Sequence, residues 1–115
     1  MRPEVKAKWV EALRSGKYSQ GRNQLRTPGF PAETEPVYCC LGVLCEVYRQ
    51  ETGLGEWGLG EQFLGNCVLL PAEVAVWAGV KSNPAIVGRH LSAINDGEYG
   101  GHDFCAIADM IERNL

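Results

Sequence analysis

The chain has 115 residues, 45% of them hydrophobic and 22% charged, and a formal net charge of −3. This length supports one hydrophobic core and is short for a chain that divides, so we expect a single domain over residues 1–115. The acidic balance argues against an extended nucleic-acid interface, because phosphate neutralisation requires clustered Lys and Arg, and direct DNA binding is not expected.

The cysteines and the hydropathy predict the compartment. Five cysteines are an odd number, and the adjacent Cys39 and Cys40 are poorly placed for a disulfide with each other, so we expect reduced thiols. The longest nearly uncharged stretch, residues 36–45, is too short to span a bilayer, and no apolar signal segment follows the first residues. We therefore expect a cytoplasmic protein that does not contact a membrane.

The chain begins with a predicted amphipathic helix. Apolar residues recur at helical spacing over residues 3–15, and Gly16 suits the position after the last turn. The polar residues 17–26 are expected on the surface. Residues 27–36 contain four residues of proline or glycine and predict a loop.

A buried helix is predicted at the centre of the chain. Residues 38–52 are apolar on nearly every side, and Gly53 suits the end of the helix. Gly42 weakens a helix, so we expect it to allow close packing against a neighbouring element. Residues 53–65 hold five glycines around Trp57, which predicts an irregular loop fixed by aromatic side chains.

The remaining elements complete an α+β class, a small fold that is mostly helical, with four to five helices and a few short strands. Asp103 is expected to cap the last helix, and the Asn-Asp-Gly sequence at 95–97 is expected to stop the helix before it. The predicted elements are a strand at 67–70, a helix at 71–78, a strand at 86–87, a helix from residue 89 to 94 and a helix at 104–114.

Cysteine chemistry is one candidate activity. Cys39 and Cys40 lie at the predicted start of a helix, where the helix dipole lowers a thiol pKa, and His90 or His102 could act as the base of a hydrolase. The alternative is that these thiols are small core side chains, and we favour it because no catalytic motif accompanies them. The groups that could orient a histidine are Asn95, Asp96 and Asp103.

The sequence gives weaker support for a metal site or a phosphate site than for cysteine chemistry. Five Cys and two His could bind zinc, but no C-x2-C or H-x3-H pair occurs, so we expect no metal and no cofactor. The cations of residues 14–26 could meet a phosphate or an acidic protein face, but we favour a solvated basic turn, because an isolated cluster of cations is a signal of low specificity. Residues 91–111 resemble a helix-turn-helix only faintly, because the second helix is acidic and the connection is long.

Several motifs distributed over the chain occur together. They resemble those of a family of small phage and prophage proteins without a settled activity, and the Y-C-C-L-G-V-L-C motif is the most specific of them. The resemblance covers most of the chain and implies a phage-encoded protein acting in the host cytoplasm. The motifs are W-V-x-A-L-R-S-G-x-Y-x-Q at 9–20, Y-C-C-L-G-V-L-C at 38–45, L-P followed by W-A-G at 77–79, N-D-G at 95–97 and F-x-x-I-A at 104–108.

The resemblance implies a class of function rather than a chemistry. We expect a non-enzymatic accessory protein that binds and modulates a host protein, with a bacterial defence component such as a CRISPR complex as one candidate partner. The expected binding residues are Tyr18, Gln20, Arg22, Arg26 and Trp57, since aromatic and arginine side chains anchor many interfaces. The alternative is a protein that binds a nucleotide-like small molecule or hydrolyses it with a cysteine; the oligomeric state stays open.

Overall fold

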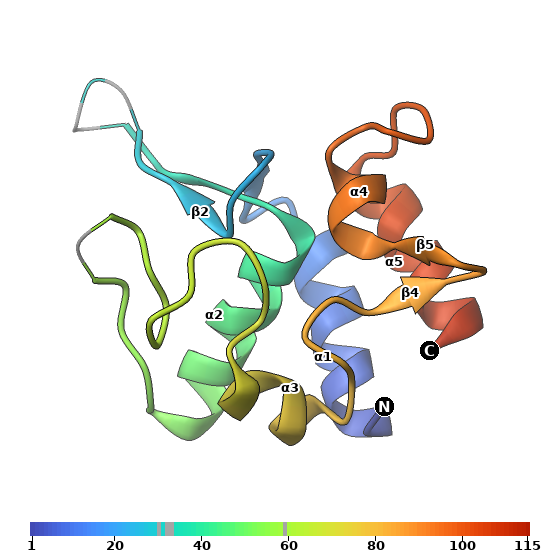
Figure 1. The fold of residues 1–115 in the computed structure, drawn as a ribbon, viewed down its shortest axis with the longest axis horizontal. Coiled ribbons are helices and arrows are strands. Elements are labelled where there is room, and N and C mark those ends of the chain that lie inside the picture. Colours follow the sequence, from blue (N-terminus) through green and yellow to red (C-terminus); the bar gives the residue numbers. More distant parts are fainter. Residues whose placement is uncertain (30, 32–33, 59) are drawn as a thin grey trace.

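The structure is a computed structural model that describes residues 1–29, 31, 34–58 and 60–115. Within these residues the chain forms five helices and short strands (Figure 1), which confirms the predicted α+β class. None of the described helices is long and apolar enough to cross a membrane. The elements are α1 (Pro3–Arg14), β1 (Ser19–Gln20), β2 (Arg26–Thr27), β3 (Val37–Tyr38), α2 (Cys40–Thr52), α3 (Ala72–Ala78), β4 (Ala85–Ile86), β5 (Arg89–His90), α4 (Leu91–Asn95) and α5 (Phe104–Asn114).

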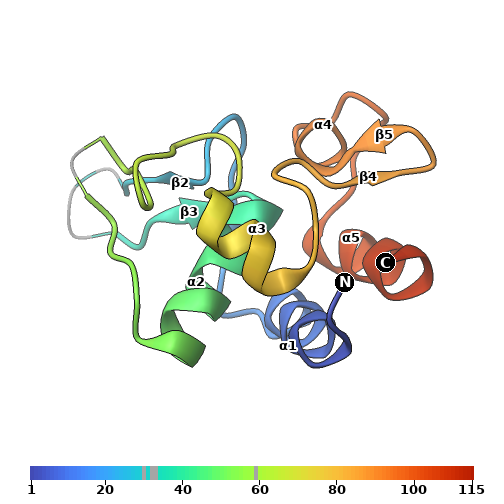
Figure 2. The ribbon, with the colours of Figure 1, turned by 60° about the horizontal axis from the view of Figure 1, so that its bottom comes forward.

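Helices α1, α2 and α5 build the core. Every residue of α2 from Cys40 to Tyr48 is buried, as expected for a helix that is apolar on nearly all sides. Helices α1 and α5 are amphipathic, and they lie side by side at one edge of the molecule (Figure 2). At the exposed border between them, the Arg14 guanidinium bonds the carboxylates of Asp109 and Glu112 at 2.5 and 3.1 Å. Their buried residues are Val5, Trp9, Val10 and Leu13 in α1 and Phe104, Ile107, Ala108 and Ile111 in α5.

The ends of the helices follow local rules. Gly53 ends α2 in the left-handed conformation, with φ of 72°. The Asp103 carboxylate accepts a hydrogen bond of 2.8 Å from the Ala106 amide and caps α5, as predicted. The start of α2 was predicted too early: Tyr38 belongs to β3, and Cys39 is the capping residue.

A three-stranded sheet accounts for this difference. Strand β3 lies between β1 and β2, parallel to β1 and antiparallel to β2. Pairing on both sides holds Tyr38 extended and delays the helix. Residues 17–26 lie at the surface as expected, apart from Leu25, which is fully buried. The sequence interpretation does not predict that this stretch contributes β1 and the first residue of β2.

The second half of the chain required further corrections. Residues 67–70 form bends and not the predicted strand, because their hydrogen bonds go to loop partners: the Cys67 carbonyl accepts from the Leu25 amide and the Leu70 amide donates to the Ser82 carbonyl. The strand predicted at 86–87 is a hairpin of β4 and β5, with Val87 in its turn. The last short helix begins at Leu91, after β5.

The loop predicted at 27–36 begins one residue later, because Thr27 belongs to β2, and the loop predicted at 53–65 is irregular where it is described. Phe63 of the glycine-rich loop is fully buried and bridges to Trp57 and to Asn66. A Cβ at Gly55 would lie 2.5 Å from the Phe63 ring, so glycine allows the loop to close over this ring. Residues 30, 32 and 33 of the predicted loop at 27–36, and residue 59 of the loop at 53–65, lie outside the described residues.

Gly42 has the role that its place in a helix predicts. The backbone of Leu25 crosses α2 at this glycine, and a Cβ there would overlap the Leu25 carbonyl oxygen. The same carbonyl accepts a hydrogen bond of 3.1 Å from the Cys39 amide, while the Leu25 amide donates to the Cys67 carbonyl at 2.7 Å. The main chain of Leu25 thus joins two distant segments at the one position where α2 lacks a side chain.

Candidate functional site

Three of the five expected binding residues lie together because each of them contacts Tyr38. They are Tyr18, Arg26 and Trp57. The rings of Tyr18 and Tyr38 meet edge to face at 5.2 Å between centroids, and those of Tyr38 and Trp57 meet at 6.0 Å. We call Tyr18, Tyr38 and Trp57 the aromatic row. The Arg26 guanidinium lies over it, 5.2 Å from the Trp57 ring and 5.9 Å from the Tyr38 ring, where the negative ring faces attract a cation.

The sheet register places this cluster. Arg26 of β2 pairs directly with Tyr38 of β3, so their side chains share one face. The Arg26 Nε atom lies 3.0 Å from a Glu61 carboxylate oxygen, and both side chains are about a quarter exposed. This ion pair lacks hydrogen-bond geometry, and the buried Trp57 Nε1 group has no acceptor among the described residues. The Glu61 carboxylate and the rings of Tyr38 and Trp57 therefore stabilise the positive charge of Arg26.

The carboxylate of Glu46 in α2 holds the Tyr38 side chain in place. Its hydroxyl donates a hydrogen bond of 3.1 Å to Glu46, which also accepts one of 2.8 Å from Arg49. Burial, together with the nearby Glu46 charge, raises the pKa of Tyr38 well above its ordinary value. The hydroxyl thus remains protonated at neutral pH and acts as a positioning donor.

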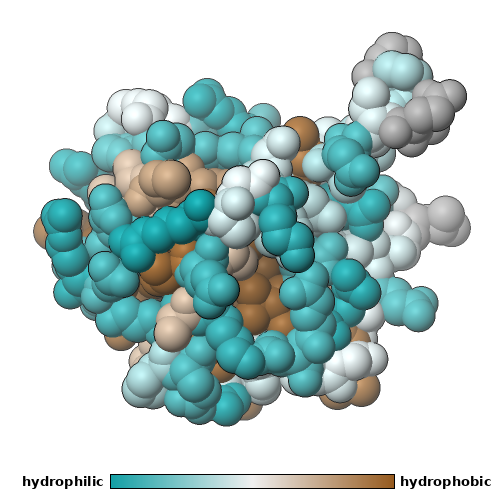
Figure 3. Space-filling view, turned by 180° about the vertical axis from the view of Figure 1, so that it is seen from behind, coloured by the Kyte–Doolittle hydropathy of each residue, from teal (hydrophilic) through white to brown (hydrophobic). Residues whose placement is uncertain are grey.

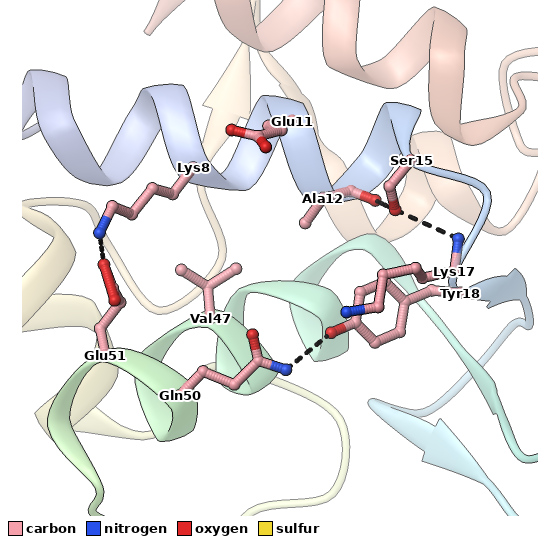
Figure 4. Close-up of a pocket in the computed structure, with 9 residues that line it drawn as sticks. All are labelled: Lys8, Glu11, Ala12, Ser15, Lys17, Tyr18, Val47, Gln50 and Glu51. Atoms are coloured by element: carbon pink, nitrogen blue, oxygen red, sulfur yellow. Dashed lines mark hydrogen bonds and ion pairs between the residues drawn. The ribbon is translucent and has the colours of Figure 1, made fainter.

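A pocket of about 290 Å³ opens beside Tyr18, between α1 and α2 (Figure 4). The Gln50 amide donates to the Tyr18 hydroxyl at 3.1 Å at one end, and an ion pair of Lys8 with Glu51 closes the other. Val47 provides an apolar floor. The lining residues are Lys8, Glu11, Ala12, Ser15, Lys17, Tyr18, Val47, Gln50 and Glu51.

Tyr18 also borders a second hollow, of about 250 Å³, towards the start of α5. Gln20 and Cys105 lie in its lining, so the ring of Tyr18 separates two concave surfaces. A third and larger hollow, of about 680 Å³, runs along α1 beside Glu112. On the face opposite that of Figure 1, apolar surface shows in patches between hydrophilic side chains (Figure 3). The concave surfaces with aromatic lining are thus concentrated around Tyr18.

The other two expected binding residues have different neighbours. The Gln20 amide donates to the Asn95 side chain at 3.1 Å and to the His102 carbonyl at 2.9 Å, so its donors are engaged within the fold. The Arg22 guanidinium lies against Gly97, where an added Cβ would stand 3.1 Å from it. The structure does not bring Gln20 and Arg22 into the aromatic row.

The sequence interpretation names Asn95 as a helix stop and as a group that could orient a histidine, and it misses the role that Asn95 has in the fold. Only 1% of it is exposed, and its side-chain oxygen accepts hydrogen bonds from the Cys40 amide and from Gln20, both at 3.1 Å. Its amide nitrogen donates to the Gly21 carbonyl at 2.8 Å. Asn95 therefore ties the start of α2 to the segment that carries Tyr18. One signal was available in the sequence, a polar residue that directly follows the apolar Leu91 and Ile94 positions of a short helix.

The thiols at the start of α2 are not activated. Burial raises the pKa of Cys39 to about 11, although its sulfur accepts a bond of 3.4 Å from the Gly42 amide. Burial also raises the pKa of Cys40 and Cys45 well above the ordinary value. The expectation that the helix dipole lowers these pKa values is wrong, because desolvation of the thiolate outweighs it. The ring nitrogens of His90 and His102 contact backbone carbonyls, at Asn83 and Tyr99.

Labelling with iodoacetamide tests this result. Cys105 is exposed and Cys39 is buried. At pH 8 a thiol of pKa about 11 is about 0.1% thiolate, against roughly 25% for an ordinary cysteine. We expect Cys105 to react at least about 100-fold faster than Cys39, as followed by peptide mass spectrometry. Cys105→Ser should remove the label at residue 105 and leave the partly exposed Cys67 as the faster of the remaining thiols, and rapid labelling of Cys39 in the folded protein would contradict the assignment.

Potential metal ligands do not cluster in the described part of the chain. Among the described residues, no group of three or more His, Cys, Asp or Glu side chains is arranged to hold a metal ion. The arrangement around Tyr18 instead combines aromatic rings, one arginine and small concave surfaces, which can bind a protein side chain or a small molecule.

Comparison with known proteins gives one match. A family model described as "Domain of unknown function (DUF8296)" matches residues 1–115. The comparisons with curated proteins and with solved structures found no match.

Proposed function

We propose that this chain, which belongs to the DUF8296 family, is a non-catalytic accessory protein of phage origin that binds and modulates a host protein. The observation that carries the proposal is the aromatic row with Arg26 lying over it, next to the pocket between α1 and α2. Partly exposed tyrosine, tryptophan and arginine side chains are the residue types that contribute most to binding at protein interfaces.

The fixed geometry of this surface supports binding. Glu61 holds Arg26, Glu46 holds Tyr38 and Gln50 holds Tyr18 before any partner arrives. Side chains that are ordered in advance lose little conformational entropy on association, so more of their contact energy contributes to affinity. The raised thiol pKa values favour this function over cysteine catalysis.

The partner that we propose is a bacterial defence component, and a CRISPR complex is the first to test. The resemblance of the sequence motifs to those of small phage proteins supports this choice. In this proposal the protein acts in the cytoplasm of the host cell, where such complexes operate.

Tyr18→Ala tests the proposed surface, since it removes the ring shared by the row and the two hollows. A host with CRISPR immunity expresses the chain and is challenged with a targeted phage. We expect the wild-type protein to raise plaque formation and to retain the defence complex in affinity capture. An anchor residue is worth about 2 kcal/mol, so Tyr18→Ala should weaken the measured affinity about 30-fold.

Leu54→Ala is the matched control, because Leu54 is a large apolar residue, 58% exposed and outside this surface. Circular dichroism verifies that both variants fold. Equal affinity of Tyr18→Ala and Leu54→Ala would show that the Tyr18 surface is not the binding site. A wild-type chain that neither restores plaques nor captures a host protein would overturn the proposed function itself.

A nucleotide-like small molecule is the second candidate ligand. The pocket between α1 and α2 favours it, since about 290 Å³ is near the lower end of ligand-site volumes and Lys17 lies in its lining without an ion pair among the described residues. Native mass spectrometry of the purified protein distinguishes the two functions. A retained small molecule supports this candidate, and the bare mass of the chain supports protein binding.

A further inference from the structure

The turn of the β4–β5 hairpin contains a strained residue. Val87 and Gly88 link the strands with φ of 50° and 74°, the two positive values of a type I′ turn. Asn-Gly and Asp-Gly are the preferred sequences for this turn, because asparagine and aspartate tolerate the left-handed region. A β-branched residue there is a steric outlier.

The folded chain gains nothing from this valine by burial. The side chain of Val87 is 87% exposed, whereas Ile86 beside it is 4% exposed and belongs to the core. A valine at this position thus combines backbone strain with an apolar group in water. Neither cost is offset by a contact within the described part of the chain, which points to a contact outside it.

The base of the hairpin is rigid. The Asn83 amide donates to the Ser92 hydroxyl at 2.9 Å, and the Leu91 amide donates to the Pro84 carbonyl at 2.8 Å. The turn of the hairpin lies at one edge of the molecule (Figure 1). Val87 is therefore presented at the tip of a fixed support, which keeps the entropy cost of docking it low.

The charge around the hairpin is opposite to that of the whole protein. Residues 74–95 contain Lys81 and Arg89 but no Asp or Glu, in a chain of net charge −3. The Arg89 guanidinium lies 4.7 Å from the centroid of the Tyr99 ring, and none of the ion pairs in the described residues involves it or Lys81. Glu98, the neighbour of Tyr99, forms no ion pair with Arg89 there. Arg89, which pairs with Ile86 at the end of the hairpin, thus places one cation beside the apolar Val87.

We propose that the hairpin tip is a second contact surface, on which Val87 inserts into an apolar pocket of the host protein bordered by carboxylates. The valine supplies apolar burial, and Arg89, held in place by Tyr99, meets the acidic border. This inference rests on the proposed function for the existence of a protein partner. It is independent of the Tyr18 surface.

The first test measures the strain, without any partner. Val87→Asn places a residue that tolerates positive φ in the turn, so we expect the melting temperature to rise by about 3 to 5 °C. Val76→Asn is the control, since Val76 is 81% exposed on α3, where no such strain exists, and it should give no rise. An unchanged or lower melting temperature for Val87→Asn would overturn the inference.

The second test identifies the contact. A photoreactive amino acid replaces Val87, or Val76 as control or Tyr18 as reference, and the full chain is irradiated in host lysate. Cross-linking from position 87, but not 76, to an apolar segment flanked by Asp or Glu supports the inference. Cross-linking at 87 to a second copy of this chain, or none at 87 while position 18 cross-links, overturns it and leaves the proposed function standing. No cross-link at any position overturns both.

Discussion

Gly42→Ala is expected to lower the free energy of unfolding by about 3 kcal/mol. The added Cβ would stand 2.8 Å from the Leu25 carbonyl carbon and closer still to its oxygen. These are backbone atoms, and the oxygen accepts the hydrogen bond of the Cys39 amide, so they cannot move aside without breaking a buried bond. Alanine favours a helix over glycine by up to about 1 kcal/mol, which is too little to compensate.

Urea unfolding followed by circular dichroism measures this loss. Gly101→Ala is the matched control, because a Cβ at Gly101 meets no atom within 4 Å and its backbone does not lie in the left-handed region. We expect the control to change stability by less than about 0.5 kcal/mol. If Gly42→Ala were as stable as Gly101→Ala, the close crossing of Leu25 over α2 would be refuted.

Asn95→Ala is also expected to lower the free energy of unfolding by about 3 kcal/mol. The substitution leaves the buried Cys40 amide and the Gly21 carbonyl without their partners, at about 1 to 3 kcal/mol for each unsatisfied group, partly recovered by relaxation. Asn95→Asp separates the two contributions. It keeps an acceptor for the Cys40 amide but has no donor for the Gly21 carbonyl, so its stability should also fall.

The same unfolding measurement applies, with Asn114→Ala as control. Asn114 is exposed and donates one hydrogen bond, of 2.8 Å, within α5, and its replacement should change stability by less than about 0.5 kcal/mol. A loss in Asn95→Ala no greater than in Asn114→Ala would mean that Asn95 does not join α2 to the Tyr18 segment.

The helices were largely predictable because their causes are local. Neighbouring residues determine the apolar periodicity of α1 and α5 and the apolar character of α2 on nearly all sides. They also determine the helix ends at Gly53 and Asp103. Tyr38 was placed in α2 wrongly for the opposite reason. Its strand pairs with residues 19–20 and 26–27, and nothing within a few positions of Tyr38 encodes those partners.

The residue types of the candidate site were predictable from the sequence, but the contacts between these residues were not. Tyr18, Arg26 and Trp57 were identified as aromatic or cationic side chains in polar segments, and the structure brings them together. The link through Tyr38 depends on the sheet register, which is a long-range property. Gln20 has the polarity of a binding residue, yet its amide is bonded to Asn95, a partner 75 positions away.

The packing of α1 against α5 has a consequence for synthesis of the protein. Among the described helices, α1 is synthesised first and α5 last. The side of the core that contains Trp9 and Leu13 of α1 can therefore form only after Ile107 and Ile111 of α5 have been synthesised. A nascent chain that stalls before residue 104 exposes this apolar stripe and is a target for chaperones and proteases. We therefore expect chains that lack α5 to be degraded in the producing cell and chains that include it to accumulate.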